Sequence, residues 1–169
     1  EKRQRVADRT ESWSETARAL QQDFSQHVQQ ETDRHGKEMT QNALWQLFRT
    51  RYGLVATPHY ALQSYRSDSQ QDGQLRLTAS VVTQGGTRQL EGHGNGLLSA
   101  AAHGLSRWVN APFVIKDYHE HTLGERSDSR SVAYIRCLFQ DGSSRWGVGI
   151  DSDVARASLQ ALFNAVSRS

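Results

Sequence analysis

A glycine-rich segment supplies backbone groups that could bind an anion. Gly94-Asn95-Gly96 stands directly before a segment with helical periodicity. The first amides of a helix have no intrahelical acceptor and lie at the positive end of the helix dipole, so they suit a carboxylate. A tight turn without a ligand is the alternative, because short glycine motifs before helices are common.

Two histidines and an aspartate could bind a metal ion. Asp117, His119 and His121 alternate along a strand-like segment and therefore face the same side. Imidazole and carboxylate groups at such a spacing can coordinate zinc. The alternative is a surface or interface role, and we predict that no metal ion is bound here.

Composition limits the classes of partner. The 169 residues include 20 Lys and Arg and 18 Asp and Glu, with a formal net charge of +2 and no long basic run, so no nucleic-acid interface is predicted. No window is apolar enough to span a membrane. The one cysteine, Cys137, lies in an apolar run and cannot form an internal disulfide, which fits a reducing, cytoplasmic location.

The N-terminal third has a helical pattern. Apolar residues spaced by three and four predict a helix from about Ser12 to His35: Trp13, Ala17, Leu20, Phe24 and Val28. Gly36 is expected to end it, and Thr40 to cap a second helix that extends to Tyr52. We therefore predict a helical linker subdomain at residues 1–56 and a second domain at residues 57–169.

The second domain has the pattern of a repeat. Alternating residues predict strands at 60–63, 75–81 and 87–91, followed by a helix at 98–109. The same order returns as strands at 113–118, 132–139 and 145–150 and a helix at 154–166. We predict an α+β fold, in which a helical hairpin precedes two pseudo-symmetric βββα units, with Gly92-His93-Gly94 aligned to Gly147-Val148-Gly149.

These motifs resemble the regulatory domain of the 2-isopropylmalate synthase family. The resemblance rests on Gly92-His93-Gly94-Asn95-Gly96, Asp117-Tyr118-His119-Glu120-His121 and Gly147-Val148-Gly149-Ile150, the last followed by Ala157-Ser158. Upstream, the segments beginning at Leu20 and Ala43 resemble the family's helical subdomain. The resemblance covers about Leu20 to Arg168, and the order and spacing of its motifs are more specific than any single motif.

The resemblance implies regulation rather than catalysis. The family's enzymes condense acetyl-CoA with 2-oxoisovalerate in a barrel that contains a divalent metal and lies upstream, so neither a catalytic residue nor a cofactor is expected in this chain. A barrel alone needs about 250 residues. Leucine, the end product, is expected to bind between the paired regulatory domains of a homodimer and to inhibit the enzyme. An isoleucine-binding domain of a citramalate synthase is the alternative.

The resemblance also implies a set of effector-binding residues. They are Gly94, Asn95, Gly96, Leu98, Ser99, Ile115, Tyr118, Thr122, Ser129, Ser131 and Asp151. Leu98 and Ile115 could form an apolar wall for a branched side chain, although ordinary core packing is the alternative. The chain departs from the family at Leu97, where proline is common, and at Thr122, Ser129 and Ser131, where alanine is frequent.

Overall fold

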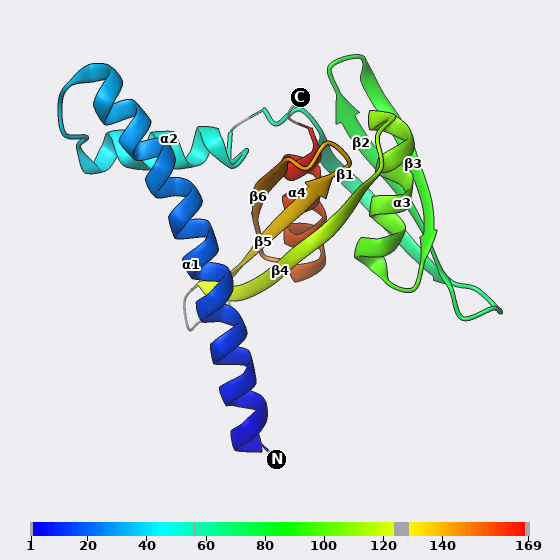
Figure 1. The fold of residues 1–169 in the computed structure, drawn as a ribbon. Coiled ribbons are helices and arrows are strands. Elements are labelled where there is room, and N and C mark those ends of the chain that lie inside the picture. The colour runs from blue at the N-terminus through cyan, green and yellow to red at the C-terminus, as the bar shows by residue number, and fades with distance from the viewer. Residues whose placement is uncertain (1, 56, 124–128, 168–169) are drawn as a thin grey trace. The chain divides into compact units, whose positions relative to one another are not determined.

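The computed structural model describes residues 2–55, 57–123 and 129–167, and the side chains of residues 2–17 and 123 lie outside this description. The chain divides into two compact units, Glu1–Arg51 and Tyr52–Ser169, whose elements are labelled in Figure 1. Tyr52 is 1% exposed, and its carbonyl accepts a hydrogen bond from the amide of Val148 at 3.2 Å. Tyr52, directly after the second helix, therefore packs with the second unit. The predicted division into a linker subdomain at residues 1–56 and a second domain at residues 57–169 stays a prediction.

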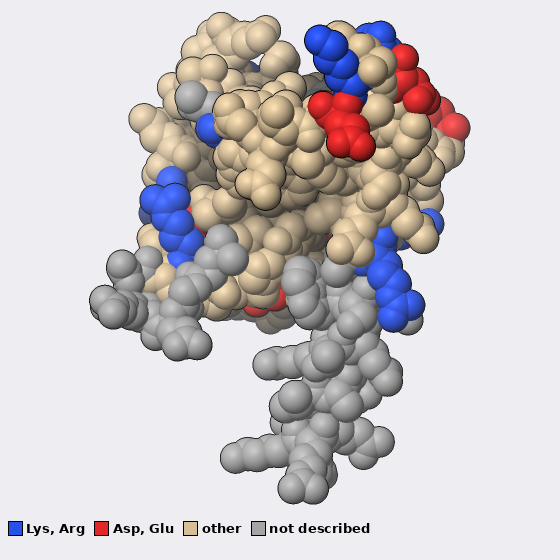
Figure 2. Space-filling model, turned by 90° about the vertical axis from the view of Figure 1, so that its left-hand side faces the viewer, with Lys and Arg blue, Asp and Glu red and all other residues tan. Residues whose placement is uncertain are grey.

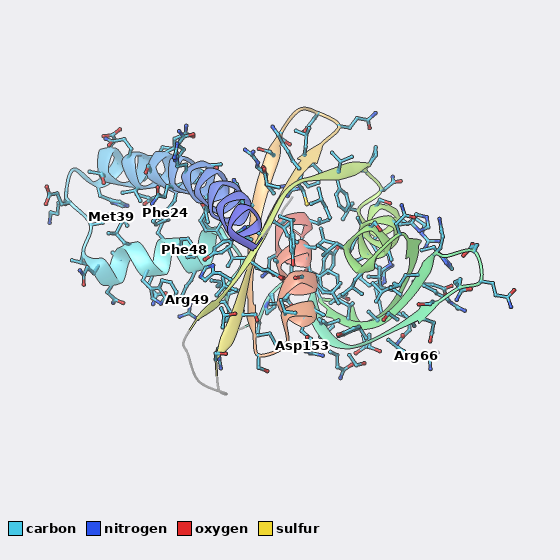
Figure 3. The ribbon with its side chains drawn as sticks, turned by 90° about the horizontal axis from the view of Figure 1, so that it is seen from below. Phe24, Met39, Phe48, Arg49, Arg66 and Asp153 are labelled. Carbon is cyan, nitrogen blue, oxygen red and sulfur yellow. The ribbon has the colours of Figure 1, made fainter. Side chains whose placement is uncertain are left out.

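The first unit is the predicted helical hairpin. Helix α1 spans Lys2–His35, so it begins earlier than the apolar stripe predicts, and α2 spans Gln41–Arg51. Gly36 follows α1 with a φ of +66°, and the Thr40 hydroxyl accepts the amide of Ala43 at 3.1 Å. The rings of Phe24 on α1 and Phe48 on α2 pack edge to face, with their centroids 5.3 Å apart (Figure 3).

The second unit contains the predicted pair of βββα motifs. The first is formed by β1 (Ala61–Ser69), β2 (Leu75–Thr83), β3 (Gly86–Gly94) and α3 (Leu97–Val109). The second is formed by β4 (Phe113–Leu123), β5 (Arg130–Phe139), β6 (Ser144–Asp151) and α4 (Val154–Val166). Each sheet is antiparallel with its strands in sequence order. The predicted α+β fold is confirmed.

The two motifs share one hydrophobic core. Helix α3 covers one face of the first sheet, α4 covers one face of the second, and the two helices contact each other (Figure 1). Alternate residues of β2 and β5, such as Leu77 and Ile135, are fully buried and join Leu105, Leu159 and Leu162 of the helices in a single cluster. Burial of this apolar surface is the main stabilisation of the unit.

The structure corrects the predicted alignment of the two glycine pairs. A Cβ built on Gly92 would lie 1.9 Å from the Ala100 carbonyl oxygen, and one built on Gly149 would lie 2.1 Å from that of Ala157. Gly92 thus corresponds to Gly149 rather than to Gly147. In this register β3 and β6, and the helices that follow them, align without an insertion.

The first strands of the two sheets show the same pseudo-symmetry. The register of β1 shifts between Leu62 and Ser64, and that of β4 shifts between Ile115 and Asp117. Such a shift marks a bulge, which bends a strand and redirects the side chains beyond it. Tyr65 and Tyr118 follow the two bulges at the same distance, so they occupy corresponding positions.

Candidate functional site

The start of α3 has the open geometry that an anion requires. Its N-cap residue is Gly96, which has no side chain to act as a cap, and its backbone is extended with φ −156°. The Ser99 hydroxyl accepts the Gly96 amide at 3.0 Å and donates to the Gly96 carbonyl at 3.1 Å. Gly94 ends β3, and Asn95 is exposed. The following amides at the helix start can therefore face a ligand.

The start of α4 occupies the equivalent place but carries its own carboxylate. Its N-cap residue is Asp153, whose Oδ1 accepts the amide of Ala155 at 2.9 Å. The second carboxylate oxygen of Asp153 accepts the Tyr65 hydroxyl at 3.2 Å. One helix of the pair is thus closed by a side chain, whereas the other has glycine at this position.

A second group of predicted site residues lies on the face of the second sheet that packs against α4. Tyr118 and Ile115 pair with Ile135 and Cys137, respectively. Thr122 pairs with Ser131, which in turn pairs with Asp151. Ser129 is half-buried just before β5. This end of the sheet is more polar than its centre.

Tyr118 is held by two polar neighbours, Glu120 and Ser158. Its hydroxyl lies 2.9 Å from that of Ser158 on α4 and donates to the carboxylate of Glu120. Burial first, and then the bond to Glu120, raises the pKa of Tyr118 to about 12. Glu120 could have been suspected from strand alternation, but Ser158 is 40 residues away and gives no local signal.

Asp151 is linked to the first turn of α4 and the residue that caps it. Its Oδ1 accepts the Asp153 amide at 2.9 Å, and its Oδ2 lies 3.7 Å from Nε of Arg156. The side chains of Arg156 and Asp151 are 32% and 36% exposed. This partly hydrated ion pair is longer than a hydrogen bond, so a ligand cation could compete for the carboxylate.

The two groups of predicted residues do not converge within one copy of the domain. Figure 1 shows the start of α3 on one side of the second unit and the end of β4 on the opposite side. Leu98 and Ile115 are half-buried and pack against the shared core. Within the second group itself, Ile115 and Thr122 are seven residues apart on β4, roughly 20 Å in an extended strand, so one ligand of amino-acid size cannot touch both in a single copy.

Asp117, His119 and His121 lie on the other face of the second sheet. Their partners across the strand pair are Arg136, Tyr134 and Val132, in that order. The carboxylate of Asp117 accepts from the Arg136 guanidinium.

The surroundings of the two histidines favour their neutral forms. Burial lowers the pKa of both His119 and His121, and the neighbouring His121 lowers that of His119 further. The His121 ring stacks on that of Tyr134 at 5.4 Å. Among the described residues, no group of three or more His, Cys, Asp or Glu side chains is placed to hold a metal ion.

A cavity of about 710 Å³ opens at another end of the second unit. Its walls come from the ends of α3 and α4, the β5–β6 turn and the segment before β1. The lining residues are His59, Tyr60, Val109, Ala111, Phe139, Gln140, Asp141, Ser143, Arg145, Val166 and Ser167. None of them belongs to the predicted effector site.

Charged side chains of both signs appear among the described residues on the face drawn in Figure 2. Lys, Arg, Asp and Glu stand there in small separate groups, and the rest of the described surface on that face is uncharged. None of the helices in the described part of the chain is long and apolar enough to cross a membrane.

The fold defines a structural class: a domain made of paired βββα units. A family model for the LeuA allosteric (dimerisation) domain matches residues 38–169. The chain belongs to this family.

Three relatives of the chain are named 2-isopropylmalate synthase. That of Marinomonas sp. (strain MWYL1) is 41% identical over 150 residues, which are 88% of this chain and 27% of the relative. Those of Thermobifida fusca (strain YX) and Rhodospirillum rubrum are 38% and 37% identical and cover 89% of this chain. The chain therefore spans about a quarter of the length of the curated relatives it matches.

Proposed function

We propose that this chain is the regulatory part of a 2-isopropylmalate synthase and that it binds leucine as a feedback inhibitor. The parent enzyme would condense acetyl-CoA with 2-oxoisovalerate in leucine biosynthesis. The observation that carries the proposal is the contrast between Gly96 and Asp153. The start of α3 has room for the carboxylate that Asp153 supplies at α4, and family membership and the names of the relatives support an amino-acid effector.

A homodimer would complete the effector site. Pairing two copies would bring the α3 start of one against the second-sheet group of the other, so that a single leucine touches both. The amides of α3 would bind the leucine carboxylate, Asp151 would accept its ammonium group, and Leu98 would face its isobutyl group. This arrangement accounts for the separation of the two groups within one copy.

Replacing Gly96 with aspartate tests the proposal. Among the described residues nothing lies within 4 Å of a Cβ built on Gly96, so the new side chain fits and can cap α3 as Asp153 caps α4. We expect the parent chain to bind leucine in titration calorimetry and Gly96→Asp to lose this binding while remaining folded. Gly85→Asp, in the exposed β2–β3 turn, is the matched control.

The choice of effector is tested in the same experiment. Leucine is expected to bind more tightly than isoleucine or valine, although one methylene in an apolar pocket is worth only about 1–3 kcal/mol. Tighter binding of isoleucine would favour the citramalate synthase alternative. Leucine binding by Gly96→Asp equal to that of the parent chain would place the site elsewhere.

A further inference from the structure

A set of polar contacts ties β1 of the first motif to α4 of the second. Nη2 of Arg156 donates to the carbonyls of Leu62 and Gln63, at 3.3 and 3.2 Å. Gln160 accepts the Leu62 amide at 3.0 Å and donates to the Tyr60 carbonyl at 2.8 Å. We call these contacts, together with the bond from Tyr65 to Asp153, the β1–α4 seam.

The β1–α4 seam supports the outer side of an edge strand. β1 is an edge strand, paired only with β2, and most of its side chains are exposed. At its bulge the backbone groups of Leu62 are bonded by side chains of α4 instead of by another strand. An edge strand with few buried apolar contacts belongs to the least stable parts of a domain. Loss of the seam is therefore expected to loosen β1 while the shared core remains intact.

Arg156 connects this seam to the proposed effector site. The Arg156 guanidinium makes both contacts. Its Nη2 donates to the carbonyls at the β1 bulge, and its Nε lies 3.7 Å from Oδ2 of Asp151. Asp151 precedes α4 by three residues and accepts the amide of Asp153, whose carboxylate in turn accepts the Tyr65 hydroxyl of β1. A change in what Asp151 binds therefore acts directly on the side chain that holds β1.

We propose that Arg156 is the positioning residue through which effector binding is transmitted to β1, the first strand after the helical unit in the sequence. This inference rests on the proposed function. The ammonium group of the effector replaces Arg156 at the Asp151 carboxylate, and the released guanidinium loosens its hold on Leu62 and Gln63. Because such coupling is reciprocal, a well-held β1 opposes effector binding to the same degree.

The test combines hydrogen exchange of the β1 amides with calorimetric titration of leucine. Three substitutions are compared with the parent chain: Arg156→Met, Arg156→Lys and Arg66→Met. Arg66 lies farther along β1, away from α4, and pairs with Asp68 at 3.5 Å, so its loss removes one arginine from the same strand without touching the seam (Figure 3).

The expected results separate coupling from a purely structural role. In the parent chain and in Arg66→Met, leucine should speed exchange at residues 61–65. Arg156→Met should exchange quickly there even without leucine and should show no further change. It should also bind leucine about twofold to fivefold more tightly, because the Arg156 guanidinium no longer competes with the leucine ammonium group for Asp151. The gain is small because a partly exposed ion pair contributes little free energy. Arg156→Lys, which keeps a cation beside Asp151, should bind leucine like the parent chain.

Three outcomes would overturn the proposal, and the first two leave the proposed function intact. Normal leucine binding with no change in β1 exchange, or weaker binding by Arg156→Met than by Arg66→Met, would disprove the coupling alone. Failure of the parent chain to bind leucine at all would disprove the proposed function together with the coupling, whatever the exchange of β1 without ligand.

Discussion

At the scale of single residues, glycine sets how closely each helix approaches its sheet. In β6, the Cβ positions of both Gly147 and Gly149 lie 2.1 Å from helix carbonyl oxygens. In β3, by contrast, the position equivalent to Gly147 is Leu90, and the small residue is on the helix, at Gly104. At this position the glycine that permits close packing is on the strand in the second motif and on the helix in the first motif.

Substitution of Gly149 should therefore destabilise the domain. The methyl group of Gly149→Ala would overlap the backbone of Ala157, which cannot move without displacing α4, and overpacking of this kind costs about 1–3 kcal/mol. The control is Gly85→Ala, where the nearest atom to the added Cβ is 4.0 Å away. Urea denaturation of both variants measures the difference, and equal stabilities would contradict the close contact.

The environment of Tyr118 predicts a loss of stability in alkaline solution. Its pKa rises to about 12 in the folded chain, mainly through burial and then through Glu120, whereas an unfolded tyrosine titrates near its ordinary value of about 10. The unfolded chain therefore releases this proton first, so the free energy of unfolding falls as pH rises from about 10 to about 12.

Replacement of Tyr118 by phenylalanine should make that fall less steep. The test is urea denaturation of the parent chain and of Tyr118→Phe at a series of pH values. Tyr60→Phe, which removes a tyrosine hydroxyl elsewhere in the same domain, is the control. An unchanged slope in Tyr118→Phe would show that its hydroxyl is not buried in this way.

At the scale of elements, the two helices that follow the sheets begin differently. α4 starts on the carboxylate of Asp153, a residue type that satisfies the first amides and complements the helix dipole. α3 starts on Gly96, where no side chain can do so. The domain therefore gains less from capping at the helix start that we propose for ligand binding, as expected when function and stability compete at one place.

Removal of the Asp153 cap should cost about 1 kcal/mol in the Asp153→Ala variant, whereas Asp153→Asn should cost less because asparagine also caps helices well. Thermal or urea unfolding of the two variants gives the difference. Tyr65→Phe, which removes only the hydroxyl bonded to Asp153, separates the cap from the seam. A loss as large in Asp153→Asn as in Asp153→Ala would show that the charge, not the cap, matters.

The element order could be predicted from periodicity, and the helix at 154–166 was predicted with its observed bounds. Strand ends were less predictable. β4 continues to Leu123, because its polar residues still pair with β5, and β3 includes Gly92 and Gly94, which the sequence assigned to the helix entrance. The contacts of Arg156 with Leu62 and of Ser158 with Tyr118 join segments far apart in the chain, so no local pattern indicated them.

At the scale of the whole domain, the fold separates the two groups of residues that we propose to bind one effector molecule. The shared core fixes the two motifs as one body, and within that body the α3 start and the end of β4 are on opposite sides (Figure 1). Tyr118 of the second-sheet group is 39% exposed, and Val154 at the start of α4 is 42% exposed. We expect such side chains to become covered when two copies pair, as apolar surface does in most protein association.

Leucine should therefore favour the dimer. A ligand that touches both copies binds the pair and not the separate chain, and at a hundred times its Kd it stabilises the bound state by about 2.7 kcal/mol for each site. Sedimentation at tens of micromolar should show twice the 19.0 kDa mass of the chain, and dilution should dissociate the pair at lower concentration with leucine than without it. Gly96→Asp should dimerise but lose the response to leucine, whereas Gly85→Asp should keep it. A 19.0 kDa species that persists at these concentrations in saturating leucine would show that the site does not bridge two copies.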